Sequence, residues 1–146
     1  MEQIFEIKKS DIMFGGMIVS ANPFQLEDKN GKTSLREKGG ISGINIENPQ
    51  LDELRGADEM VTDSTNAILI LSYPFKKTIG YRIQNDNGFN RENIALELSK
   101  AYSEIYSEKE KYVTGYDGLS DLELTMIMVF EVNGEIYLEP KVESKK

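Results

Sequence analysis

The chain has 146 residues and a formal net charge of −8, and this length predicts a single domain over residues 1–146. Its acidity argues against nucleic acid or an anionic membrane as a partner, because both repel a negative surface. The chain contains neither cysteine nor histidine, which excludes disulfides, thiol nucleophiles, Cys/His zinc sites and imidazole bases.

The N-terminal residues, MEQIFEIKKSDI, have no basic head followed by a long apolar run, so no signal peptide is expected. The longest apolar run, residues 67–71, is far too short to span a bilayer. The lack of cysteine fits a reducing compartment. Together these features predict a soluble, cytoplasmic protein.

The first part of the chain predicts two strands followed by an irregular segment. The strands are expected at residues 2–8 and 12–19, the second interrupted by Gly15 and Gly16, as at a bulge. Residues 21–64 show no sustained period of 2 or 3.6, apart from one expected helical turn at 49–54. We expect an irregular acidic insertion, mobile in the free protein because it is too polar to offset its ordering entropy.

Regular structure returns as a hairpin. Residues 66–73 form a near-continuous apolar run, which is typical of a strand buried on both faces. Residues 78–84 alternate between apolar and polar side chains, and Pro74 is suited to the turn between the two strands because it cannot donate to a ladder.

One amphipathic helix is predicted over residues 90–108. Asn90 is a suitable N-cap, and Phe89 and Ile94 have the spacing of a hydrophobic staple. The apolar residues that share one helical face are Ile94, Ala95, Leu98, Ala101, Tyr102, Ile105 and Tyr106. This period makes Tyr102 and Tyr106 half-buried core residues whose hydroxyls reach the rim.

The last third predicts a second hairpin. Alternation places Leu122, Leu124, Met126, Met128 and Phe130 on one face of a strand. Asn133-Gly134 is a strong turn signal, and a returning strand at 136–138 is expected to end at Pro140. The predicted fold is therefore α+β, with an antiparallel sheet of two to three hairpins and the helix at 90–108 in two layers.

Between Leu71 and Leu124 the chain resembles a poorly characterised family. That family has a strand ending in Tyr-Pro, a Gly-Phe-Thr-Arg helix start, a Tyr-x-x-Ile-Tyr-x-x-Glu helix and a Gly-His-Asp…Asp-Leu strand. The matching residues are Gly88, Phe89, Arg91, Tyr102, Ile105, Tyr106, Glu108, Gly115, Asp117, Asp121 and Leu122. This chain departs from the family's pattern at two positions: Asn90 stands where Thr is usual, and Tyr116 stands where His is expected. The resemblance covers little more than a third of the chain, implies the hairpin–helix–strand core, and brings no activity with it.

The absence of the usual catalytic side chains, the acidity and the long insertion favour a non-catalytic intracellular binding module of the inhibitor, immunity or adaptor type. Its expected partner is a basic macromolecule, in practice a protein, because an acidic surface attracts a basic one. The candidate contact residues are Ile41, Ile44, Ile46, Leu51, Leu54, Tyr112 and Tyr116.

A cluster of carboxylates supplies the alternative function. Asp117, Asp121 and Glu123 follow one another at a strand mouth and have the hard oxygen ligands that Mg²⁺ or Ca²⁺ prefers. They would serve a metal-dependent hydrolase or a small-ligand binder. The simpler interpretation is a turn followed by the solvent-exposed face of a strand. No other cofactor is expected, because GGISG at 39–43 matches neither phosphate-binding pattern.

Overall fold

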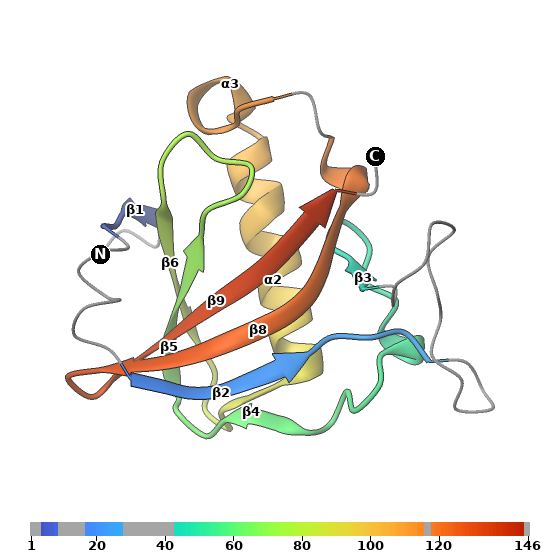
Figure 1. Ribbon diagram of the computed structural model, residues 1–146, viewed down its shortest axis with the longest axis vertical. Coiled ribbons are helices and arrows are strands. Elements are labelled where there is room, and N and C mark those ends of the chain that lie inside the picture. The colour runs from blue at the N-terminus through green and yellow to red at the C-terminus, as the bar shows by residue number, and fades with distance from the viewer. Residues whose placement is uncertain (1–3, 9–16, 28–42, 116–117, 145–146) are drawn as a thin grey trace.

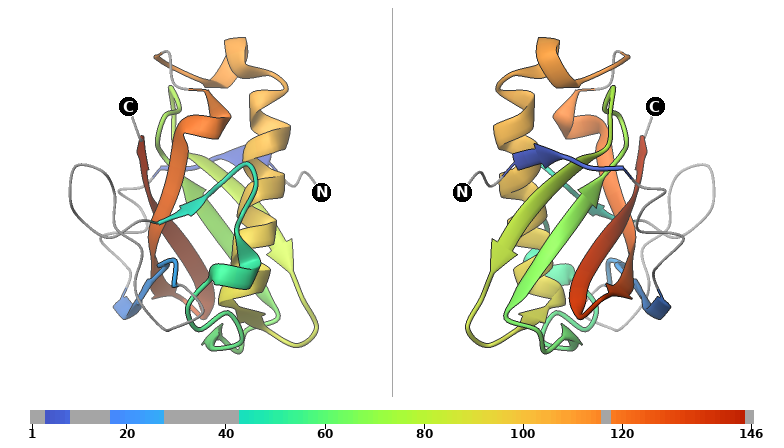
Figure 2. Two further views of the ribbon diagram at one scale, coloured as in Figure 1. Left: turned by 90° about the vertical axis from the view of Figure 1, so that its right-hand side faces the viewer. Right: turned by 90° about the vertical axis from the view of Figure 1, so that its left-hand side faces the viewer.

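The computed structural model describes residues 4–8, 17–27, 43–115 and 118–144. One main helix, α2 (Arg91–Tyr106), lies along one face of a seven-stranded sheet (Figures 1 and 2). The strands are β1 (Ile4–Glu6), β2 (Met17–Pro23), β3 (Ile44–Asn45), β4 (Met60–Thr62), β5 (Asn66–Leu71), β6 (Ile79–Gln84), β7 (Phe89–Asn90), β8 (Leu122–Val132) and β9 (Glu135–Ser144). The predicted α+β class, with a helix packed against a sheet, is confirmed.

The order of strands in the large sheet is β1-β6-β5-β9-β8-β2, and β3 also pairs with β8. β4 and β7 form a separate two-stranded sheet. Short helices complete the described chain: η1 (Leu51–Glu53), α3 (Lys109–Tyr112) and η2 (Leu119–Asp121). Among the described residues, no helix is long and apolar enough to cross a membrane.

The α2 helix begins where the sequence predicts. The Asn90 side chain accepts from the Asn93 backbone N–H at 2.7 Å, and the Asn93 side chain accepts from the Asn90 N–H at 3.0 Å. This reciprocal pair satisfies N–H groups at the end of the helix. The predicted apolar stripe is buried from Ile94 to Ile105, so periodicity located both the helix and its inward face.

The two helix tyrosines differ in burial. Tyr106 is half-buried, as predicted, but Tyr102 is fully buried. The Tyr102 hydroxyl donates to the Tyr73 carbonyl at 2.7 Å, and its ring lies 5.1 Å from that of Phe75. The prediction that both hydroxyls reach the rim is wrong for Tyr102, whose buried hydroxyl instead donates a hydrogen bond to a backbone carbonyl.

Both predicted hairpins are present, but the sheet that joins them is mixed. β5 pairs with β6 and β8 pairs with β9, each antiparallel. β5 and β9 run parallel, with Ile68 opposite Tyr137 and Leu69 opposite Leu138. The expectation of an antiparallel sheet is therefore wrong at the seam between the hairpins. β5 is buried on both faces from Ala67 to Leu71, as predicted.

A bulge in β8 changes which side chains face the helix. The register with β9 shifts between Leu124 and Met126, leaving Thr125 as an extra residue. A one-residue insertion moves the following side chains to the opposite face. Ile127 and Val129 therefore join Leu122 and Leu124 in the core around α2. The prediction that Met126, Met128 and Phe130 share a face with Leu122 and Leu124 is wrong.

Two strands extend beyond their predicted ends. β2 runs on to Pro23 along the edge of β8, a position where proline is tolerated. Residues 12–16 of the expected 12–19 strand lie outside the described residues. β9 continues through Pro140, which pairs with Ile127. The pairing with β5 ends at Leu138, so Pro140 lies where, among the described residues, one side of β9 has no partner strand.

The second half of the expected irregular segment is packed structure. Residues 43–64 contain β3, η1 and β4, and the backbone of Leu26 forms a bridge with Leu54. Gly43 lies so close to β8 that a side chain there would collide with the backbone of Leu124. Such short elements bury side chains without showing a period, so the sequence pattern did not reveal this packing.

Candidate functional site

The predicted contact residues from the insertion mostly lie inside the protein. Ile44 and Ile46 are each 1% exposed and Leu54 is 6% exposed. They pack in the main core with α2, so these three side chains are not exposed for contact with a partner. Leu51 and Tyr112 are half-buried at the surface. Ile41 and Tyr116 lie outside the described residues.

Leu51 and Leu54 nevertheless line a surface depression of about 510 Å³. We call it the acidic hollow and define it by its lining residues: Leu51, Asp52, Leu54, Gly56, Ala57, Asp58, Glu59 and Glu92. Three of these lining residues, Leu51, Leu54 and Ala57, are apolar, and four carry carboxylates.

Backbone hydrogen bonds hold the hollow against the start of α2. The Arg91 N–H donates to the Glu59 carbonyl at 3.2 Å, and the Glu92 N–H donates to the Ala57 carbonyl at 3.1 Å. These N–H groups have no partner within a helix. The turn at 57–59 therefore has a fixed position relative to the helix, which makes the hollow a preformed surface.

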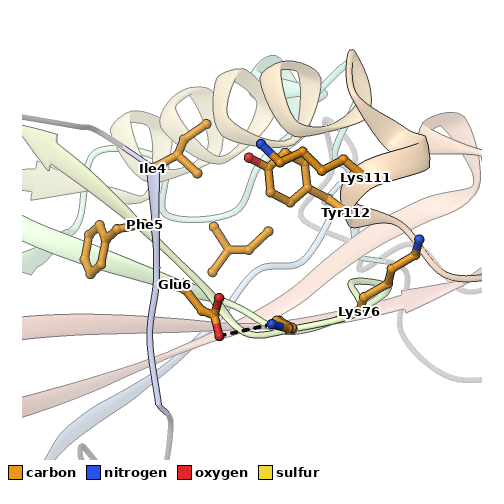
Figure 3. Close-up of a pocket in the computed structure, with 8 residues that line it drawn as sticks. Ile4, Phe5, Glu6, Lys76, Lys111 and Tyr112 are labelled. Carbon is orange, nitrogen blue, oxygen red and sulfur yellow. Dashed lines mark ion pairs between the residues drawn. The ribbon is translucent and has the colours of Figure 1, made fainter.

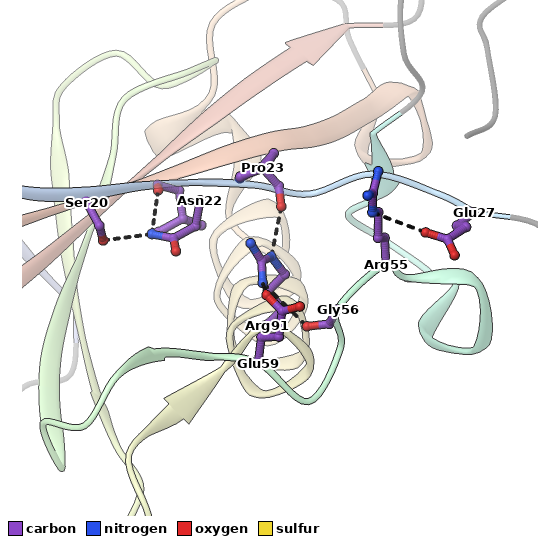
Figure 4. Close-up of polar contacts among 9 residues, drawn as sticks. Ser20, Asn22, Pro23, Glu27, Arg55, Gly56, Glu59 and Arg91 are labelled. Carbon is purple, nitrogen blue, oxygen red and sulfur yellow. Dashed lines mark hydrogen bonds and ion pairs between the residues drawn. The ribbon is translucent and has the colours of Figure 1, made fainter. Parts of the chain in front are cut away.

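Arg91 adds a side-chain clamp to this arrangement (Figure 4). Its Nε donates to the Pro23 carbonyl at 2.9 Å, and its Nη1 lies 2.9 Å from Glu59 Oε2 and 3.5 Å from the Gly56 carbonyl. The guanidinium also lies 5.9 Å from the centre of the Phe24 ring. One side chain from α2 thereby ties the end of β2 to the wall of the hollow.

The predicted carboxylate cluster is only partly described. Asp121 Oδ2 accepts from the Gly118 N–H at 3.0 Å, closing the η2 turn. Glu123 is 5% exposed, within β8. Asp117 lies outside the described residues, and among those described no group of three carboxylates is placed to hold a metal. The metal site stays a prediction.

A second cavity, which the sequence did not indicate, lies between β1, the loop before β6, and α3 (Figure 3). Its volume is about 380 Å³. We call it the lysine pocket, lined by Ile4, Phe5, Glu6, Lys76, Lys77, Ile79, Lys111 and Tyr112. Tyr112, a predicted contact residue, forms one wall. Lys76 and Lys77 are adjacent in sequence, but Lys111 and the β1 residues are distant from them, so no local motif could have revealed the pocket.

Comparison with known proteins adds no further assignment to these two sites. No family model, no curated protein and no solved structure matches the chain.

Proposed function

We propose that the chain is a non-catalytic binding protein of the inhibitor, immunity or adaptor type, and that its acidic hollow receives a basic segment of a protein partner. The observation that carries this proposal is the combination of four carboxylates with the apolar residues Leu51, Leu54 and Ala57 in one depression. A lysine or arginine side chain has the complementary form, an apolar stem with a cationic head.

The geometry of the hollow supports this function in two further ways. The backbone hydrogen bonds from α2 to Ala57 and Glu59 mean that little ordering entropy is lost when a partner binds. Arg91 is paired with Glu59, while Asp52 and Asp58 are exposed at the rim. The whole chain carries −8, so its long-range field steers a basic partner toward it.

Capture from native lysate with matched variants tests the proposal. The hollow variant is Asp52→Asn with Asp58→Asn and Glu92→Gln. The control variant, Asp86→Asn with Glu108→Gln and Glu131→Gln, removes the same charge at exposed positions elsewhere. We expect wild type and control to retain a basic protein at about 50 mM salt and to release it at about 500 mM, because salt screens exposed charges.

The hollow variant should fail to retain that protein. Equal capture by the hollow and control variants would show that net charge, and not this depression, attracts the partner. Absence of any captured protein with wild type at low salt would also contradict the proposal.

A further inference from the structure

The lysine pocket has fixed walls. The Ile7 N–H donates to the Thr78 carbonyl at 3.1 Å, joining β1 to the start of β6. On the other side, the Lys76 N–H donates to the Tyr112 carbonyl and the Thr114 N–H to the Pro74 carbonyl, both at 2.8 Å. Backbone hydrogen bonds thus hold the edge strand, the 72–78 loop and the end of α3 around one cavity.

The interior of the pocket is largely apolar. Ile79 is 3% exposed, and Ile4 and Tyr112 pack against the same core. In Figure 3 the Ile4 side chain extends toward the helical side of the sheet, where Tyr112 and Lys111 lie, whereas the Phe5 ring extends away from them. A volume of about 380 Å³ falls within the range of small-molecule pockets.

The charge around the pocket is opposite to that of the whole chain. Lys76, Lys77 and Lys111 line it with Glu6 as the carboxylate, giving a local charge of +2 in a chain of −8. Lys77 Nζ lies 3.6 Å from Glu6 Oε1, and Lys76 Nζ donates to the Glu110 carbonyl at 2.8 Å. An ammonium group has three donors, so this one bond leaves Lys76 with protons for a ligand.

From this combination we propose that the lysine pocket binds a small organic carboxylate with an apolar body. The lysine ammonium groups hold the anionic head, and Ile4, Ile79 and Tyr112 contact the body. Charge complementarity selects the head, and the apolar lining selects the body. The site is separate from the acidic hollow, whose partner would be cationic, so either assignment can fail without the other.

Melting-temperature titrations with octanoate, acetate and 1-octanol test the proposal on the intact chain. A ligand that binds only the folded state raises the melting temperature in a saturable way. We expect this from octanoate alone, because acetate supplies the head without the body and 1-octanol the body without the charge. The proposal would be overturned if octanoate gave no saturable shift. It would also be overturned if acetate or 1-octanol bound with the same affinity as octanoate.

Two variants with opposite effects make the test independent of folding. Lys77→Gln should weaken octanoate binding about threefold, and Glu6→Gln should tighten it about threefold, as expected for exposed charges. Lys100→Gln, on the exposed face of α2, is the control and should change nothing. Unchanged affinity in both pocket variants, or an equal change in the control, would contradict the assignment.

Amide chemical shifts locate the ligand. Octanoate should move the resonances of Lys77, Ile79 and Tyr112 and leave that of Leu51, in the acidic hollow, unaltered. Shifts concentrated outside the lysine pocket would overturn the proposed site.

Discussion

Arg91 connects three parts of the chain through a side chain that is only 11% exposed. Its guanidinium contacts the carbonyls of Pro23 and Gly56 and the carboxylate of Glu59. The planar fork of arginine suits such a junction, since it presents several donors in fixed directions. At the residue scale, Arg91 is therefore the main polar link between β2, the acidic hollow and α2.

Replacing Arg91 with leucine should lower the free energy of unfolding by about 2 kcal/mol, because it removes the hydrogen bonds to Pro23 and Gly56 and the charge-assisted one to Glu59. Urea denaturation measures this loss. Arg55→Leu is the control: Arg55 pairs with Glu27 at 3.2 Å on the surface, 61% exposed, and should cost about 0–1 kcal/mol. Equal losses in the two variants would show that Arg91 is not the link described.

Two buried tyrosines predict a loss of stability at alkaline pH. Burial raises the pKa of Tyr102 well above its ordinary value of 10.0, and burial together with the Glu104 charge raises the pKa of Tyr81. The folded state therefore holds these protons more tightly than the unfolded state. Their stabilising contribution is complete below about pH 10 and decreases as pH rises above it.

The midpoint of urea denaturation should accordingly fall between about pH 9 and about pH 11. Tyr102→Phe removes one of the titrating groups, so its midpoint should fall less over this range. At neutral pH the same variant should lose about 1 kcal/mol, the worth of the hydrogen bond to Tyr73. An identical pH dependence in wild type and variant would contradict the account of Tyr102.

At the element scale, the elements that have a local sequence pattern could be predicted from the sequence. The period of α2 gave its N-cap and its buried face, and Asn133-Gly134 gave the β8–β9 turn, where both residues have positive φ, 51° and 83°. The hairpin of β5 and β6 was also predictable, because each strand has its own hydrophobic pattern.

Features that depend on distant contacts were not predictable in this way. The Thr125 bulge has no sequence signature, and the parallel pairing of β5 with β9 joins segments far apart in the chain. β3 has two residues and β4 has three, which is too few to show a period. The acidic hollow also combines two segments, and only the apolar and acidic character of 51–59 could suggest it.

Limited proteolysis distinguishes packed structure at 43–64 from the irregular insertion predicted from sequence. With a protease that cleaves after glutamate, cutting after Glu53 and Glu59 should be as slow as cutting after Glu97 and Glu104 in α2. The bond after Glu37, within the segment 21–64 that the sequence predicts to be mobile, should be cut first. Rapid cutting after Glu53 would contradict the packing of β3, η1 and β4.

At the scale of the whole molecule, the charge distribution separates two kinds of ligand. The acidic hollow and the net charge of −8 favour a basic protein, whereas the lysine pocket offers a local positive site. Because the two regions are lined by different residues, neutralising one should leave the other intact.

Divalent-metal titration tests the alternative function at Asp117, Asp121 and Glu123. A metal site at 100 times its dissociation constant would add about 2.7 kcal/mol to stability. The proposed binding function expects no such shift from Mg²⁺, Mn²⁺ or Ca²⁺. A saturable shift in wild type that disappears in Asp117→Asn with Asp121→Asn would establish the metal site.

Hydrogen exchange of the chain, free and bound to the captured basic protein, tests the role of the acidic hollow most directly. We predict that binding slows amide exchange over residues 51–59 and leaves β9, which contributes no residue to the hollow, unchanged. The slowing should be absent in a mixture of that protein with the Asp52→Asn, Asp58→Asn, Glu92→Gln variant. Protection confined to another face, with none over 51–59, would contradict the proposed function.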